Sequence, residues 1–262
     1  MTEVAIHPGV LADVSTHILQ GIRRRPRQER FGLLFGRVVG GDFWVTAYVP
    51  YTGGTRGKDF VEFDEQRLYR RVRRLTDARP SGTFLGLYHS HPLRFYERIP
   101  SDLIELAEAS LVDRASFTRV HPRLRRAYRL DAIVAVGPAR QAPSVTRFPI
   151  IRCMPNWIRH KGHTWTFNLL GNREVLLWMP GRVQVAIEPG CCRWTRQFHW
   201  FFALRMYARQ GRRVVPCRLT VDLELPYAGR WDRTTGPMPQ VASTLPGPCE
   251  PGDSAEPAGG LG

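Results

Sequence analysis

The chain has 262 residues, of which 43% are hydrophobic and 23% are charged, so its composition supports a substantial core and excludes a disordered chain. No apolar run approaches the roughly 18 residues of a membrane span, and five cysteines are too few, and odd in number, for a disulfide scaffold. We therefore expect a soluble, cytoplasmic protein of one or two domains, with no membrane partner.

The charge is strongly positive and is carried by arginine. Lys and Arg number 38 against 23 Asp and Glu, which gives a net charge of +15, and only Lys58 and Lys161 are lysines. Such a surface attracts an acidic partner, either a protein or a nucleic acid. A GC-rich genome produces the same arginine bias, so the charge alone does not identify the partner.

Apolar spacing predicts alternating helices and strands in the first 150 residues. Apolar residues at helical spacing after Pro8 predict a first helix, and two strands are expected at 31–36 and 43–49, with a turn at Gly40 and Gly41. The following elements are expected to be a helix, a buried strand, a helix and a buried strand, over 63–75, 83–88, 101–111 and 131–136. This alternation predicts an α/β domain at 1–150.

Residues 151–231 form a basic, Trp-rich extension. Between Arg152 and Arg218 there are twelve Lys or Arg, two acids and five of the seven tryptophans. Its residues 194–210 are predicted to form an amphipathic helix with Trp194, Phe198, Phe201 and Phe202 on one side. Aromatic residues among arginines fit a nucleic-acid surface, and more commonly a core beside a solvated face.

The last 31 residues differ from the rest of the chain. From Asp232 onward, 12 of them are Gly or Pro. This composition predicts a disordered tail at 232–262.

The sharpest chemical feature is the sequence Tyr88-His89-Ser90-His91-Pro92 at the end of a predicted strand. Side chains alternate along a strand, so His89 and His91 point to the same side. Neutral imidazoles are favoured zinc ligands, and a catalytic zinc typically has three protein ligands and a water. Asp102, eleven residues after His91 at the start of the next helix, is the expected third ligand.

These residues resemble the zinc motif of the JAMM/MPN+ metalloproteases. In that motif a His-x-His pair is followed by seven residues, a serine, two residues and an aspartate, so the distance from second His to Asp is the one found here. The family also has a glutamate three residues before a glycine in a Gly-Leu-Leu-x-Gly strand. Glu29, followed by Gly32-Leu33-Leu34-Phe35-Gly36, matches this pattern. The resemblance covers residues 1–150.

One motif position departs from the family pattern. The family serine, which helps to hold the catalytic water, falls on Ile99, while Ser101 lies two residues later. Either a bulged loop lets Ser101 supply the hydroxyl, or the hydroxyl is missing and turnover falls by about 100- to 1000-fold. Aligning Ser101 with the family serine would put Ile104 at the aspartate position, with Glu105 as a fallback ligand, so we reject that alignment.

The resemblance implies a JAMM/MPN-like α/β fold, in which a central mixed β-sheet is flanked by helices. It also implies a zinc isopeptidase or peptidase, with Zn²⁺ on His89, His91 and Asp102 and with Glu29 and Ser101 in the catalytic machinery. Zinc would activate a water and polarise the scissile carbonyl, while Glu29 moves the proton. The implied substrate is the bond after the C-terminal glycine of a ubiquitin-like or sulfur-carrier-like protein, and the arginine-rich composition suggests a bacterial member.

Two other functions stay open. A non-catalytic MPN-type interaction module is favoured by Ile99 and opposed by the intact Glu29, His89, His91 and Asp102. A nucleic-acid-associated protein is favoured by the charge, although an acidic protein partner matches that charge equally well. Nucleic acid is therefore the less favoured partner.

The remaining histidines and cysteines form no recognisable motif. His7, His17, His121 and His199 are isolated, and ordinary surface or core roles are expected for them. A second, structural zinc site would have to combine histidines and cysteines whose spacing matches no common finger pattern, namely His160, His163, Cys153, Cys191, Cys192 and Cys217.

Overall fold

A computed structural model describes residues 2–24, 28–56, 61–79, 82–92, 101–118, 124, 129–139, 157–170, 173–186, 193–211 and 213–231. The predicted tail, 232–262, lies outside these residues, as does the predicted boundary near residue 150. No helix of the described ranges is long and apolar enough to cross a membrane.

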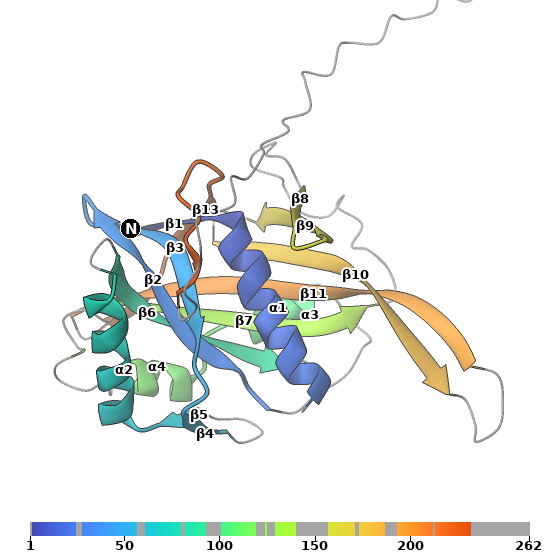
Figure 1. The fold of residues 1–262 in the computed structure, drawn as a ribbon, viewed down its shortest axis with the longest axis horizontal. Coiled ribbons are helices and arrows are strands. Elements are labelled where there is room, and N and C mark those ends of the chain that lie inside the picture. Colours follow the sequence, from blue (N-terminus) through green and yellow to red (C-terminus); the bar gives the residue numbers. More distant parts are fainter. Residues whose placement is uncertain are drawn as a thin grey trace, which may run out of the picture.

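A mixed sheet of 12 strands organises the chain (Figure 1). Its order is β13-β1-β3-β2-β6-β7-β11-β10-β9-β8, with β12 paired to β11 and β14 paired to β3. The strands up to the middle of the chain are β1 (Glu3–Ile6), β2 (Phe31–Val39), β3 (Asp42–Pro50), β6 (Thr83–Pro92) and β7 (Leu130–Ala139). The later ones are β8 (Trp157–His160), β9 (His163–Leu170), β10 (Glu174–Ala186), β11 (Arg193–Gln210), β12 (Arg213–Pro216), β13 (Arg218–Val221) and β14 (Gly229–Arg230).

Four helices and a small hairpin complete the described elements. The hairpin consists of β4 (Gly54–Arg56) and β5 (Val61–Phe63). The helices are α1 (Pro8–Arg24), α2 (Glu65–Asp77), α3 (Ser101–Leu106) and α4 (Leu111–Thr118). The helix predicted over 101–111 is shorter than expected: α3 ends at Leu106, a turn follows over Ala107–Ser110, and a second helix, α4, begins at Leu111.

Local sequence signals set the first elements as predicted. The apolar stripe of α1 is buried, and β2 and β3 form the expected antiparallel hairpin. Gly40 and Gly41 connect these strands with φ values of 61° and 95°. Glycine takes such positive φ angles without steric cost, and two of them in succession match the twist of a two-residue hairpin turn.

The helix predicted over 194–210 is wrong, because this segment is the 18-residue strand β11. It lies inside the sheet, antiparallel to both β7 and β10. Phe201, Phe202, Ala203 and Leu204 are all buried, since both faces of a central strand are covered. A continuous apolar run of this kind shows no two-residue alternation, and its aromatic residues happened to fall at helical spacing.

The strands of the predicted extension complete the sheet of the predicted domain. Strand β11 pairs with β7 from Ala208↔Leu130 to His199↔Ala139, and β13 pairs in parallel with β1. Residues before and after position 150 thus share one sheet and one core.

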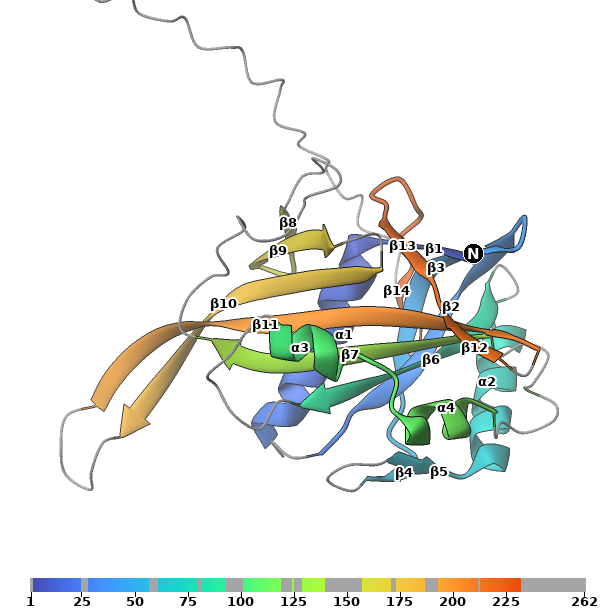
Figure 2. The ribbon, with the colours of Figure 1, turned by 180° about the vertical axis from the view of Figure 1, so that it is seen from behind.

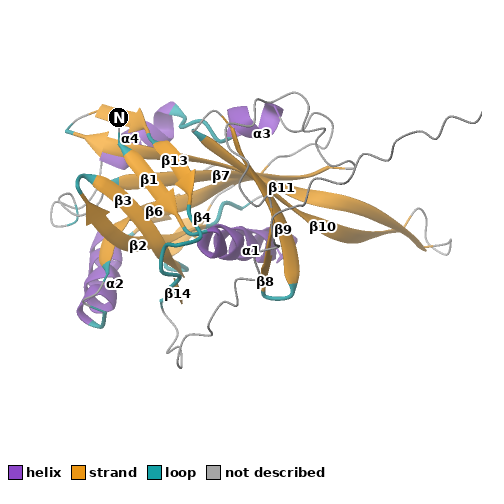
Figure 3. Cartoon of the chain, turned by 90° about the horizontal axis from the view of Figure 1, so that it is seen from above, coloured by secondary structure: helices purple, strands orange, loops and turns teal. Residues whose placement is uncertain are grey.

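Helices cover both faces of the sheet. Helix α1 packs on the face that carries Leu34, Tyr88 and Val134 (Figure 1). The opposite face is covered by α2 around Leu33 and Leu87, and by α3 around Ala135. Figure 2 shows α3 and α4 in front of the sheet in the reverse view, and Figure 3 shows α1 and α3 on opposite sides from above.

A buried polar cluster around Asp13 connects α1 to later segments of the chain by hydrogen bonds. The Asp13 carboxylate, 1% exposed, accepts hydrogen bonds from His160 Nε2 at 2.8 Å, Lys161 Nζ at 2.5 Å and Tyr227 Oη at 2.5 Å. Burial alone raises the pKa of Asp13, but these three donors outweigh it, so the pKa lies below the ordinary value.

We expect Asp13→Asn to lower the free energy of unfolding at pH 7 by roughly 1.5–3 kcal/mol, the range for hydrogen bonds to a charged group. A carboxylate with a lowered folded-state pKa contributes stability above its unfolded pKa, near 4, and loses it as the pH falls through the folded value. The difference between the two proteins should therefore shrink below about pH 4. Urea unfolding at several pH values measures this.

Asp77→Asn is the matched control, because the Asp77 carboxylate forms only an exposed i,i+4 ion pair with Arg73. Exposed pairs contribute little, so this variant should stay within about 0.5 kcal/mol of the wild type. Equal losses in the two variants would contradict the role assigned to Asp13.

Candidate metal centre

Two histidines lie on the sheet face that α2 and α3 cover. His89 lies opposite Phe31, whose side chain packs in the α2 cluster, and His91 lies level with Ala135, which packs under α3. Both side chains are 14% exposed. The alternation of β6 thus places both imidazoles on one face, as predicted, where neither helix covers them completely.

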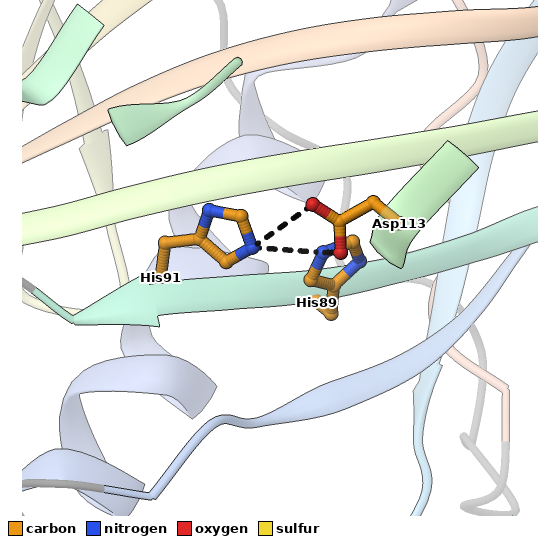
Figure 4. Close-up of side chains that lie close together, drawn as sticks. All are labelled: His89, His91 and Asp113. Atoms are coloured by element: carbon orange, nitrogen blue, oxygen red, sulfur yellow. Dashed lines mark hydrogen bonds and ion pairs between the residues drawn. The ribbon is translucent and has the colours of Figure 1, made fainter. Parts of the chain in front are cut away.

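Asp113 of α4 joins the two histidines (Figure 4). Its Oδ1 lies 3.2 Å from His89 Nε2, and its Oδ2 lies 3.7 Å from His91 Nε2. The two Nε2 atoms lie 3.1 Å apart. Within the described residues this is the group of three ligand-type side chains whose donor atoms come close enough to hold one metal ion.

The Nδ1 atom of each ring, which points away from the centre, lies near an acceptor oxygen. His91 Nδ1 lies 2.7 Å from the Leu106 carbonyl oxygen, and His89 Nδ1 lies 3.4 Å from Asp131 Oδ1. Because a carbonyl only accepts hydrogen bonds, His91 Nδ1 carries the proton. Asp131 Oδ1, which has no hydrogen-bond partner among the described residues, favours a proton on His89 Nδ1 as well. Once the proton on His89 Nε2 is displaced, each ring can present an Nε2 lone pair to the centre, the arrangement that metal-binding histidines use.

The close approach of the two Nε2 atoms needs a proton or a cation between them. Two Nε2 lone pairs 3.1 Å apart repel each other unless a proton or a cation lies between them. Zinc–nitrogen bonds of about 2.0–2.1 Å place tetrahedral ligands about 3.4 Å from one another. The separation of the two Nε2 atoms, 3.1 Å, and that of Asp113 Oδ1 from His89 Nε2, 3.2 Å, lie near that value, and one atom from each of the three residues lies within 4.8 Å of the others, so the residues fit a zinc-sized cation with nitrogen and oxygen ligands.

Asp113 is itself fixed by a helix-capping motif. Its Oδ2 accepts hydrogen bonds from the Ser110 backbone N–H at 2.8 Å and from the Ser110 hydroxyl at 2.6 Å, and Ser110 Oγ accepts one from the Asp113 N–H at 3.1 Å. This reciprocal pair begins α4. It occupies Oδ2 and leaves Oδ1 directed at His89.

The electrostatics of the centre favour cations. Burial lowers the pKa of His89, but Asp131 and Asp113 outweigh it and raise the pKa well above 6.5. Burial likewise raises the pKa of Asp113, and hydrogen bonds with His89 and His91 reverse this and lower it strongly. In the metal-free protein a proton on His89 Nε2 therefore takes the central position, where it competes with a metal.

Glu29 lies next to the histidines along the sheet. The Arg30 backbone N–H donates to Ser90 Oγ at 2.9 Å, and the Ser90 N–H donates to the Arg30 carbonyl at 2.8 Å. Continuing the Phe31↔His89 register by two residues places Glu29 level with His91. Glu29 is 8% exposed, so it is not the solvated glutamate that its charged sequence neighbours would suggest.

The other two predicted residues are placed only by their backbone. Ser101 and Asp102 form the first turn of α3, and their side chains lie outside the described part of the chain, as does Ile99. Their roles as hydroxyl donor and zinc ligand stay predictions.

Asp113 and Asp131 were not predicted as site residues from the sequence. Ser110-Leu111-Val112-Asp113 is a capping-box pattern, which signals the start of a helix and not a ligand. Asp131 begins a predicted buried strand, where a charged side chain is unusual and could have drawn attention.

The other histidines and cysteines form no second centre among the described residues. His160 is hydrogen-bonded to Asp13, while the Cys217 thiol is buried, which raises its pKa to about 12. Cys153, Cys191 and Cys192 lie outside the described residues.

No protein-family model and no curated protein matches the chain. Among solved structures, the chain is similar to the solution structure of protein DSY2949 from Desulfitobacterium hafniense, with 17% identity and a TM-score of 0.34. The match covers 64% of this chain and 85% of that chain. A likeness this distant carries no conclusion about function.

We expect the purified protein to hold about one zinc per chain, and His91→Ala to lose it, because the variant removes one of the converging Nε2 donors. Asp113→Asn and Asp102→Asn then identify the carboxylate ligand, and the geometry favours a loss with Asp113→Asn. Elemental analysis after dialysis measures the metal. A zinc that survives His91→Ala would place the metal elsewhere in the chain.

Metal affinity should fall as the pH falls, and the fall should begin above the ordinary histidine pKa. Zinc must displace the proton on His89, whose raised pKa keeps that proton bound at higher pH than in a free imidazole. Competition with a chromophoric chelator between pH 6 and 8.5 measures the slope. An affinity that does not change over this range would contradict a ligand role for His89.

Proposed function

We propose that this protein is a zinc-dependent hydrolase of the JAMM/MPN type, acting as a peptidase or isopeptidase. The observation that carries the proposal is the pair of Nε2 atoms 3.1 Å apart, each on a ring whose Nδ1 faces an acceptor. Glu29, the carboxylate that the family resemblance assigns to proton transfer, is buried beside the same strand.

The residues supply a ligand set and a proton acceptor. His89, His91 and one carboxylate would hold the ion, and a bound zinc supplies a water of lowered pKa and a polarised carbonyl. With three protein ligands, one position stays open, as in catalytic sites. Glu29 takes a proton from the attacking water and returns it to the leaving amine.

Asp113 is the carboxylate that we favour as third ligand. Its Oδ2 is held by Ser110 while Oδ1 faces His89, so the whole ligand set is fixed by outer hydrogen bonds. Asp102, the ligand implied by the family spacing, remains the alternative. In that case Asp113 would accept hydrogen bonds from the histidines without binding the metal.

We propose a substrate that ends in glycine, as the family resemblance implies. The ligands are only 14–15% exposed, so a slim chain reaches them more easily than a bulky one. The C-terminal tail of a ubiquitin-like or sulfur-carrier-like protein meets this requirement. The bond cleaved would join its last glycine to an amine.

The test uses a ubiquitin-like and a sulfur-carrier-like protein, each carrying a fluorogenic amine on its C-terminal glycine. The zinc-loaded wild type should release the amine, and Glu29→Gln should reduce the rate by at least about 100-fold while keeping its zinc. Glu105→Gln is the matched control, because Glu105 is exposed on α3. It should leave the rate unchanged.

The outcomes separate the rival functions. Zinc binding without hydrolysis of either substrate would favour a non-catalytic interaction module. Absence of zinc, even after reconstitution at neutral pH, would overturn the hydrolase and leave His89, His91 and Asp113 as a buried ion-pair network. A salt-dependent shift with DNA or RNA would support the nucleic-acid alternative.

A further inference from the structure

The turn between α3 and α4 controls two parts of the metal centre. It begins after Leu106, whose carbonyl accepts from His91 Nδ1, and it ends at Ser110, which caps α4 and holds Asp113. A displacement of this turn would change the orientation of His91 and the position of the Asp113 carboxylate together. The contacts that hold the turn in place therefore also determine the geometry of the centre.

Tyr207 of β11 is bonded to the middle of this turn. Its hydroxyl accepts a hydrogen bond from the Ala109 N–H at 3.0 Å and donates to the Ala107 carbonyl at 3.4 Å. The side chain is 4% exposed. One hydroxyl thus satisfies a donor and an acceptor of the turn, and the rigid phenol ring sets their distance from the sheet.

The position of Tyr207 in the sheet relates it to the histidines. Tyr207 lies opposite Asp131 in the β7–β11 register, so the two side chains share the sheet face that carries the centre. Asp131 faces His89 directly, whereas Tyr207 reaches His91 and Asp113 through the turn. Neighbouring residues on two strands thereby support all three candidate ligands.

An ion pair also connects β11 to the α3–α4 turn. The Arg205 guanidinium, two residues before Tyr207, bonds to Glu108 of the turn and lies 2.7 Å from Glu174 Oε1 of β10. Arg205 is 18% exposed and Glu108 62% exposed, so the bond to the turn is partly solvated. Its contribution is smaller than that of the buried hydroxyl.

We propose that Tyr207 is a positioning residue for the metal centre: through the α3–α4 turn its hydroxyl sets His91 and Asp113, and the Arg205–Glu108 pair assists it. This inference rests on the proposed metal site. It assigns part of the basic, Trp-rich region to the centre, because both supporting side chains come from β11.

The test compares Tyr207→Phe with Tyr227→Phe. Both variants remove one hydroxyl, but the Tyr227 hydroxyl bonds to Asp13, in the cluster on α1. Zinc affinity is measured by chelator competition, and thermal unfolding of the metal-free proteins is measured in parallel. We expect Tyr207→Phe to weaken zinc binding about 10- to 100-fold, the usual effect of losing an outer support, and Tyr227→Phe to leave it unchanged.

A second measurement follows the turn itself without metal. Amide hydrogen exchange should become faster at residues 107–113 in Tyr207→Phe and not in Tyr227→Phe. Glu108→Gln, which alters only an exposed side chain, should weaken zinc binding about two- to fivefold. This variant keeps the proposal testable if Tyr207→Phe does not fold.

Three results would overturn the positioning role. These are wild-type zinc affinity in Tyr207→Phe, equal losses of affinity in both tyrosine variants, or unchanged exchange in the turn. A wild type that binds zinc without hydrolysing the glycine-linked substrates defeats only the proposed activity, since the affinities still report on Tyr207. A wild type that binds no zinc defeats the metal site and the positioning role together, and the exchange data then show only what holds the turn.

Discussion

The parallel pairing of β6 with β7 is the contact on which the candidate centre depends. It brings Asp131 to the strand that carries both histidines, deep inside the sheet. The strands approach closely because Gly86 has no side chain, and a Cβ there would collide with the Leu130 carbonyl. On the other side of β6, pairing with β2 brings the segment that carries Glu29. A central strand therefore collects polar groups from both neighbours.

The polar groups are compatible with the sheet interior because each faces a group of complementary charge or hydrogen-bonding character. Unpaired buried charges and polar groups are costly, and here carboxylates face imidazoles while a carbonyl accepts from a ring N–H. The net effect is a set of outer contacts that orients the inner donor atoms. Such preorganisation is what distinguishes a binding centre from histidines that merely lie close together.

Local patterns predicted the elements, and long-range contacts decided the rest. Helix α1 and the β2–β3 hairpin follow from apolar spacing and from Gly40-Gly41, and strand alternation was enough to put His89 and His91 on one face. Asp113 follows a turn that is hydrogen-bonded to Tyr207 of β11, and no spacing rule predicts a contact between segments so far apart in the sequence. Strand β11 itself was mistaken for a helix, since burial on both faces removes the alternation that marks a strand.

The length of β11 has a consequence for any shortened form of this chain. Its 18 residues pair along β7 on one side and β10 on the other. A chain ending near residue 150 would leave β7 with an open edge of unpaired backbone groups, which is a template for aggregation. It would also lack Leu176, Phe201 and Ala203, the residues on which α3 packs. The smallest unit that folds around these histidines therefore extends well past the segment that carries them.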